Sequence, residues 1–147
     1  MQLYVDSFPA EERRPIEQMP PDDSAFHLYA IESYGLITTW QFPDFTLIEH
    51  FAIHPHLRKQ GIGSEVLTAL TGNLILEVEP AETSPLAARR IKFYQRNGFK
   101  LLNVPYMQPP YAPGLPEVEL RLMVRGEIAN IEQAINLIHR RVYGASN

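Results

Sequence analysis

Residues 46–73, TLIEHFAIHPHLRKQGIGSEVLTALTGN, decide the fold, because a strand pattern, a glycine-containing turn and a helix pattern follow one another without interruption. The first part of the stretch alternates with a period of two, as a β-strand does. One face of the expected strand carries Phe45, Leu47, Glu49, Phe51 and Ile53, and the other carries Thr46, Ile48, His50 and Ala52. Both faces are mostly apolar, so we expect this strand to lie in the interior of a sheet.

The strand pattern ends at His54-Pro55, since proline has no backbone N–H and holds the preceding residue in an extended conformation. Helical spacing begins after Gly61 and ends near Gly72-Asn73. The apolar positions of this helix are Ile62, Val66, Leu67 and Leu70. The loop of residues 58–64 therefore joins the C-terminal end of a strand to the N-terminal end of a helix.

This loop suits an anion. The first backbone N–H groups of a helix have no intrahelical partner and lie at the positive end of the helix dipole. Gly61 and Gly63 have no Cβ to block a phosphate, and Arg58 and Lys59 add positive charge. The dinucleotide pattern G-x-G-x-x-G requires a third glycine where the chain has Val66, and the P-loop sequence Gly-Lys-Ser/Thr is missing, so neither pattern fits.

The loop resembles the acyl-CoA-binding loop of the GNAT acetyltransferases, whose signature is Q/R-x-x-G-x-G/A between a central strand and a helix. Here the signature reads Arg58, Gly61 and Gly63, and Ile53-His54-Pro55 precedes it as in the family. A second stretch, ARRIKFYQRNGF at residues 88–99, resembles the family helix that ends in tyrosine, three residues and Gly-Phe. The resemblance covers roughly residues 26–124.

The resemblance implies an α/β (α+β) fold: a mixed, mostly antiparallel central sheet flanked by helices, with two parallel strands that splay apart at the cofactor site. We expect a single GNAT-like domain over residues 1–147, with a short N-terminal segment (1–23) and a C-terminal helix (126–147). The family usually begins with a strand and a longer helix, so this chain is expected to start later by a strand and part of a helix. Acetyl-CoA is the implied co-substrate. The residues implied to contact it are Phe51, Ala52, Ile53, Arg58, Lys59, Gln60, Gly61, Ile62, Gly63, Ser64 and Tyr94.

Composition narrows the class of protein without deciding it. A chain of 147 residues with 45% hydrophobic content is long enough for one compact domain. A net charge of −4 and a pI near 5.7 argue against broad nucleic-acid binding. We find no signal peptide or membrane span, and we expect a cytoplasmic protein. The chain has no cysteine, and its five histidines show no metal-ligand spacing, so no metal is expected.

The other elements follow from local patterns. A short polar helix is expected around Ala10–Met19. Strands are expected at Phe26–Glu32, Leu36–Trp40, Leu74–Val78, Gly98–Val104 and Glu117–Val124, the third of them parallel to the central strand and the last with one wet face. Ser84-Pro85 starts a helix that ends at Asn97-Gly98. The residues from Pro105 to Pro116 form either a substrate wall or a plain connection between strands.

A tail helix is expected at Glu127–Tyr143, with an apolar stripe that packs on the domain's own sheet or, alternatively, on a second copy in a homodimer. Trp40 and Phe42 are expected in the core more than in an acceptor pocket.

Amide formation from a thioester requires a base for the amine and an acid for the leaving thiolate. Glu49 is the first choice as base, because apolar surroundings on the central strand would raise the pKa of its carboxyl. The alternative for Glu49 is a buried structural partner, and His50 on the opposite face and Glu77 are further candidates. Tyr94 is the expected acid, since it matches the tyrosine of the family motif. Its alternative is a core aromatic residue.

The expected function is transfer of an acetyl group from acetyl-CoA to a primary amine of a small molecule or peptide, by direct attack in a ternary complex. The alternative is a non-catalytic acyl-CoA-binding or dimerisation domain on the same fold.

Overall fold

The computed structural model describes residues 25–31, 35–53 and 61–145, with the remaining positions outside this description. The strands are β1 (Phe26–Ile31), β2 (Gly35–Gln41), β3 (Thr46–Ile53), β4 (Leu74–Val78), β5 (Lys100–Leu101), β6 (Tyr106–Gln108) and β7 (Val118–Arg125), and the helices are α2 (Ile62–Ala69), the 3-10 helix η4 (Ala81–Thr83), α3 (Pro85–Arg96) and α4 (Ile131–Arg141). The polar helix expected around Ala10–Met19 and the late start of the chain fall on residues that are not described.

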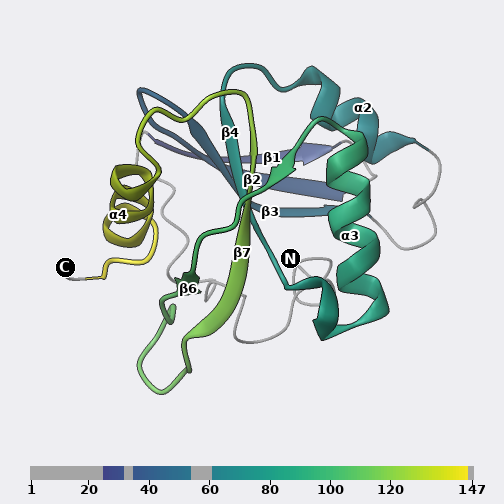
Figure 1. The fold of residues 1–147 in the computed structure, drawn as a ribbon. Coiled ribbons are helices and arrows are strands. Elements are labelled where there is room, and N and C mark those ends of the chain that lie inside the picture. The colour runs from purple at the N-terminus through teal and green to yellow at the C-terminus, as the bar shows by residue number, and fades with distance from the viewer. Residues whose placement is uncertain (1–24, 32–34, 54–60, 146–147) are drawn as a thin grey trace.

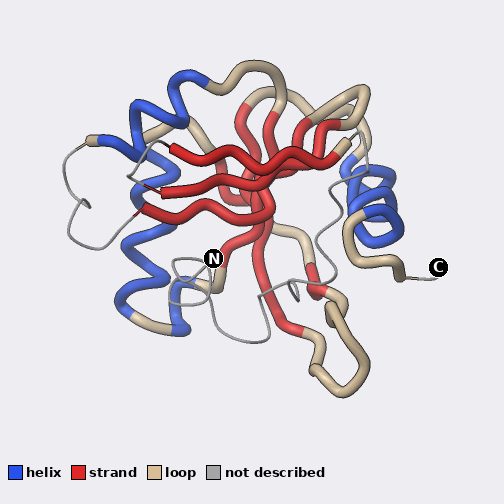
Figure 2. The backbone as a smooth tube through the Cα atoms, turned by 180° about the vertical axis from the view of Figure 1, so that it is seen from behind, coloured by secondary structure: helices blue, strands red, loops and turns tan. Residues whose placement is uncertain are grey.

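The described strands form one mixed sheet in the order β1-β2-β3-β4-β7-β5, and β6 pairs with the other end of β7. The pairing of β3 with β4 is parallel, and the other pairs are antiparallel. Helices α2 and α3 lie on one side of the sheet and α4 lies on the other, as Figures 1 and 2 show from opposite directions. The sheet is therefore the mostly antiparallel, helix-flanked arrangement expected from the sequence, with β3 in its interior.

Each side of the sheet has its own hydrophobic core. The α3-side core contains Ile37, Ile48, Leu67, Leu74, Leu76, Val78, Ile91, Phe99 and Met123. The α4-side core contains Ala25, Phe26, Trp40, Phe42, Phe45, Leu47, Ile75, Tyr106, Leu120, Leu122, Val124, Ala134, Ile138 and Val142. Trp40 and Phe42 are thus core residues, and the apolar stripe of α4 packs on the chain's own sheet.

Strand β3 contains a β-bulge at Glu49, which the alternating pattern did not reveal. Thr38 of β2 pairs with His50, but Thr39 pairs with Ile48, so Glu49 is one extra residue on β3. A bulge interrupts the alternation of side chains between the two faces. Phe51 accordingly packs with Ile48 in the α3-side core, so the prediction that Phe51 shares a face with Glu49 and Leu47 is wrong.

Three other predicted elements differ from the structure. The strand expected at Gly98–Val104 is reduced to two residues, Lys100–Leu101, at the edge of the sheet. Strand β7 does not have one wet face along its whole length. Met123 is fully buried in the α3-side core because β7 lies between β4 and β5 under α3. The tail helix begins at Ile131, not Glu127, because the side chain of Asn130 caps it by accepting a hydrogen bond from the Gln133 backbone N–H at 3.1 Å.

Arg125, at the end of β7, ties the two helices of the α3 side together. Its guanidinium donates hydrogen bonds to the backbone carbonyls of Leu67 and Leu70 at the end of α2, both at 2.9 Å, and of Asn97 at the end of α3, at 3.3 Å. The guanidinium carbon also lies 5.2 Å from the centre of the Phe99 ring. Helix C-termini have unsatisfied carbonyls and a negative dipole end, so one cation stabilises both.

Within the described residues, no helix is long and apolar enough to cross a membrane.

Candidate active site

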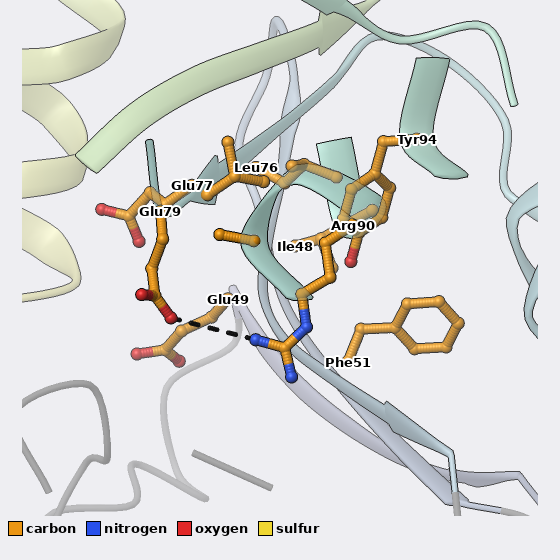
Figure 3. Close-up of a pocket in the computed structure, with 10 residues that line it drawn as sticks. Ile48, Glu49, Phe51, Leu76, Glu77, Glu79, Arg90 and Tyr94 are labelled. Carbon is orange, nitrogen blue, oxygen red and sulfur yellow. Dashed lines mark ion pairs between the residues drawn. The ribbon is translucent and has the colours of Figure 1, made fainter. Parts of the chain in front are cut away.

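The candidate site lies where β3 and β4 part. Their parallel pairing runs from Thr46–Leu74 to Ile48–Leu76, although β3 continues to Ile53 and β4 to Val78. A pocket opens at this point (Figure 3), and its lining residues are Ile48, Glu49, Phe51, Leu76, Glu77, Val78, Glu79, Ala87, Arg90 and Tyr94. The strands therefore separate near the loop, as the family resemblance implied.

The bulge explains how one pocket reaches both sides of the sheet. Ile48 and Phe51 belong to the α3 side, whereas the Glu49 side chain belongs to the α4 side with Leu47. In Figure 3 the carboxylates of Glu49, Glu77 and Glu79 lie toward one side of the pocket, and Phe51 and Tyr94 lie toward the other. The pocket thus has an acidic end and an aromatic end.

Tyr94 forms the aromatic end from helix α3, whose limits are fixed locally. The Ser84 hydroxyl accepts a hydrogen bond from the Ala87 backbone N–H at 3.0 Å, and Pro85 occupies the first turn, as expected from the sequence. The helix ends at a left-handed glycine, Gly98 with φ 89°, where the Phe99 N–H bonds to the Tyr94 carbonyl at 3.0 Å. Both helix ends are therefore set by residues close to Tyr94 in sequence.

Burial raises the pKa of the Tyr94 phenol from 10.0 to about 12, and the nearby charge of Arg90 opposes this rise only in part. Its ring packs edge-on against the rings of Phe93 and Phe99, with centroid distances of 5.3 and 5.6 Å. At neutral pH this phenol carries its proton and is able to donate it.

Residues 61–64 lie at the start of α2, where the sequence placed the anion site. Gly61 has φ 78°, a left-handed conformation that residues with a Cβ rarely adopt, and a Cβ there would meet open space. A Cβ on Gly63 would lie 3.0 Å from the Phe93 ring, so this glycine allows α2 and α3 to approach closely. The backbone amides of Ile62, Gly63 and Ser64 are the first of the helix and lack intrahelical acceptors.

Of the remaining residues predicted to contact the cofactor, only some line the pocket. Phe51 lines the pocket, while Ala52 and Ile53 follow it toward the end of β3 and lie outside the lining. Arg58, Lys59 and Gln60 lie outside the described residues. The structure thus brings Phe51, Tyr94 and Glu49 into one pocket and places Gly61–Ser64 at the neighbouring helix terminus.

Glu49 occupies a polar site, not the apolar one expected. One carboxylate oxygen accepts a hydrogen bond from Trp40 Nε1 at 2.9 Å, and the other accepts one from the Tyr111 hydroxyl at 2.6 Å. The side chain of Glu49 is only 1% exposed. His50, expected on the opposite face, has Nδ1 4.0 Å from Glu49 Oε1, because the bulge disrupts the alternation between the two residues.

Glu77, on β4, is held in the same manner by two tyrosines. Tyr143, which follows α4, donates to Oε1 at 2.5 Å, and Tyr106 of β6 donates to Oε2. Burial, and secondly the charge of Glu77, raise the pKa of both phenols well above the usual value. The rings of Tyr111 and Tyr143 lie 4.9 Å apart and connect the surroundings of the two carboxylates.

The tyrosine partners of the carboxylates were missed as functional residues. Tyr106 and Tyr111 lie in the segment from Pro105 to Pro116, and Tyr143 is the last residue of the expected tail helix. No spacing rule connects them with Glu49 or Glu77. Their polar hydroxyls in otherwise apolar segments are the available signal, since a buried tyrosine hydroxyl usually finds a partner. The segment from Pro105 to Pro116 therefore supplies one hydrogen-bond donor to each of the two carboxylates.

Arg90 spans the middle of the pocket, with its Nη1 4.0 Å from Glu79 Oε1, the ion pair drawn in Figure 3. Ala87 lines the pocket from helix α3. In the described part of the chain, no group of three or more His, Asp or Glu side chains is arranged to hold a metal ion.

The Tyr94 phenol and the Glu49 carboxylate thus line one pocket between two splayed strands. A mixed sheet with a pocket where two parallel strands separate is the arrangement of a class of acyl-transferring enzymes. The family model described as "Acetyltransferase (GNAT) domain" matches residues 23–101. The chain belongs to the GNAT acetyltransferase family.

A solved structure from Bacteroides thetaiotaomicron, described as a GNAT-family protein, is 37% identical to this chain, with a TM-score of 0.91; the match covers 99% of this chain and 90% of that one. Escherichia coli ElaA is 16% identical over 85% of this chain and 86% of its own, with a TM-score of 0.52. A variant of the spermidine N-acetyltransferase SpeG from Vibrio cholerae is 14% identical over 72% and 68%, with a TM-score of 0.53. The last two similarities concern the fold alone. No protein with a curated description matches the sequence.

Proposed function

We propose that this protein is an acetyl-CoA-dependent N-acetyltransferase that acts on a primary amine of a small molecule or peptide. The observation that carries the proposal is the pocket between β3 and β4, which has the Tyr94 phenol at one end and the Glu49 carboxylate at the other. Membership of the GNAT family supports acetyl-CoA as the acyl donor.

The α3 side of the pocket has features that would bind acetyl-CoA, the acyl donor. The amides at the start of α2 offer hydrogen bonds and a positive dipole end to a phosphate. Gly61 leaves open space where a side chain would stand, so a phosphate is able to approach the backbone. The thioester arm would then enter between β3 and β4 beside Phe51, with its sulfur toward Tyr94.

The acidic end suits the acceptor. An alkyl amine with a pKa of about 10.4 is mostly protonated at neutral pH and must lose a proton before it attacks. Glu49 takes this proton in the proposed reaction. The amine nitrogen then forms a bond to the thioester carbonyl carbon within the ternary complex, the C–S bond breaks, and the nitrogen gives its surplus proton to the Tyr94 phenolate that forms when Tyr94 protonates the thiolate. Glu49 returns its proton to solvent. The departing thiolate, whose conjugate acid has a pKa near 8.5, receives the proton of Tyr94. The raised pKa of Tyr94 keeps that proton available across the physiological range.

The test is calorimetric titration of the protein with acetyl-CoA and with CoA, followed by a thiol-release assay with a panel of primary amines. Gly61→Glu places a negative side chain where the phosphate is expected and should abolish binding. Gly72→Glu is a matched control, because Gly72 also has a positive φ, of 79°, and open space around its Cβ position, but follows the C-terminal end of α2.

Micromolar binding that is lost in Gly61→Glu and kept in Gly72→Glu, together with thiol release that depends on an amine, would support the proposal. The absence of acetyl-CoA binding by the natural sequence would overturn it. Binding without transfer to any amine would instead favour a non-catalytic acyl-CoA-binding domain.

A further inference from the structure

Glu77 accepts hydrogen bonds from two segments that are distant from it in sequence. It lies on β4, beside the point where β3 and β4 separate, and it lines the same pocket as Glu49. Tyr106 is 29 residues from Glu77 in the sequence and Tyr143 is 66 residues from it, yet each donates to one of its carboxylate oxygens. A carboxylate that accepts a hydrogen bond on each oxygen has a fixed orientation. If Glu77 had only a structural role, it would not need to line the pocket.

The position of Tyr143 is determined by the end of α4. Ile138 and Val142 are buried in the α4-side core, and the Val142 N–H bonds to the Ile138 carbonyl at 2.9 Å. The Ala145 N–H then bonds to the His139 carbonyl at 2.9 Å, so the backbone is held on both sides of Tyr143. The Tyr143 hydroxyl is therefore placed by packing of the helix and not by a flexible terminus.

Tyr143 also links the two carboxylates. Its hydroxyl bonds to Glu77, while its ring packs at 4.9 Å from the ring of Tyr111, whose hydroxyl bonds to Glu49. Glu77 accepts a hydrogen bond from each of two tyrosines and also lines the pocket, so its negative charge is held at the acidic end. An ammonium group has three donors and a positive charge, and matches such a carboxylate.

We propose that Glu77, aligned by Tyr143 and Tyr106, is a specificity-determining group that binds the acceptor amine in its ammonium form, so that the C-terminal end of the chain completes the acceptor site. This inference rests on the proposed acetyltransferase function. Glu49 removes the proton in that reaction, whereas Glu77 holds the amine near it before deprotonation. Tyr143 is a positioning residue that acts through Glu77.

The experiment measures steady-state kinetics with saturating acetyl-CoA and a panel of butylamine, 1,4-diaminobutane, 2-phenylethylamine and glycinamide. Tyr143→Phe removes one hydroxyl and keeps the ring against Tyr111. For each amine that the natural sequence acetylates, KM for the amine should rise about tenfold, while kcat and the Kd for acetyl-CoA should stay within threefold. Tyr106→Phe should give the same pattern, because it removes the donor to the other oxygen.

Three further variants separate positioning from general loss of structure. If Tyr143 acts through Glu77, then adding Tyr143→Phe to Glu77→Gln should change KM less than twofold beyond Glu77→Gln alone. Tyr29→Phe is the control and should leave KM unchanged, because Tyr29 is 50% exposed on β1 and is not one of the residues that line the pocket.

This inference would be overturned if Tyr143→Phe acetylates amines with an unchanged KM, or if Tyr143→Phe and Glu77→Gln raise KM independently in the double variant. Either result would leave the acetyltransferase function standing. A natural sequence that binds acetyl-CoA but acetylates no amine would overturn both.

Discussion

The two ends of the pocket are built in different ways. At the aromatic end, Tyr94 is placed by a helix whose N-cap is Ser84 and whose C-terminal glycine is Gly98, all within fifteen consecutive residues. At the acidic end, Glu49 is held by Tyr111, 62 residues away, and Glu77 by Tyr143, 66 residues away. Tyr94 is thus positioned by a local motif, whereas the acidic end is an assembly of distant segments.

The largest effect is expected at the aromatic end of the pocket. Tyr94→Phe removes the proposed proton donor and should lower kcat about 100-fold, since general acid catalysis typically contributes at least this much. The Kd for acetyl-CoA should change less than threefold, because the ring remains. In the natural sequence, the raised pKa of Tyr94 predicts no fall in kcat from loss of this proton between pH 7 and about 10. A kcat within threefold of the natural value for the variant would show that Tyr94 is a core aromatic residue.

The next effect concerns Arg125, which holds the C-terminal end of α3, the helix of Tyr94, next to α2. Arg125→Met removes three hydrogen bonds from a guanidinium to helix-terminal carbonyls and should lower the free energy of unfolding by about 3 kcal/mol. Arg121→Met is the matched control on the same strand, since Arg121 donates to the single carbonyl of Leu102 at 2.8 Å and should cost about 1 kcal/mol. Chemical denaturation measures both, and equal losses would contradict the role given to Arg125.

A smaller effect is expected for a long-range contact at the acidic end. Tyr111→Phe deletes the hydroxyl that donates to the buried Glu49 carboxylate, and should cost about 1.5 kcal/mol of stability. The comparison predicts that acetyl-CoA affinity is unaffected, because the change lies at the other end of the pocket. Denaturation and calorimetry on the same variant provide the check. A weakened affinity for acetyl-CoA would mean that the two ends are not independent.

Helix caps offer a matched pair across the comparison. Ser84 caps α3 and Asn130 caps α4, each by accepting one backbone hydrogen bond, at 3.0 and 3.1 Å. Either substitution by alanine should cost about 1 kcal/mol. Kinetics should then separate them, since Ser84→Ala should affect KM for acetyl-CoA and Asn130→Ala should affect KM for the amine. If both variants shift the same constant, the division between the two ends fails.

The smallest effect is a dependence of stability on pH at the acidic end. Burial lowers the pKa of His139 below 6.5, although a hydrogen bond with the Met107 backbone and the charge of Glu117 oppose this. The folded state therefore binds a proton less readily than the unfolded state, so stability should decline as the pH falls below about 6.5. His139→Gln should reduce that decline, as measured by thermal unfolding between pH 5 and 8. An unchanged pH profile would assign the dependence to other groups.

Much of the fold was predictable because it follows from short-range rules. The order of strands and helices, the interior position of β3, the cap at Ser84 and the left-handed glycine after α3 all follow from residues within a few positions of one another. Helix ends were less accurate where an unrecognised cap, Asn130, competed with the apolar stripe. The face assignment of Phe51 was wrong because a period-two pattern contains no information about an inserted residue such as the bulge at Glu49.

The sequence by itself determined the family, the parallel β3–β4 pair, the glycine-containing start of α2 and the place of Tyr94. These features depend on motifs in which the interacting residues are close in the chain. Only the tertiary structure decided that Glu49 is surrounded by Trp40 and Tyr111, and that Glu77 is held by Tyr106 and Tyr143. Contacts between such distant residues depend on strand order, on the bulge and on where α4 packs, and no local pattern encodes these distances.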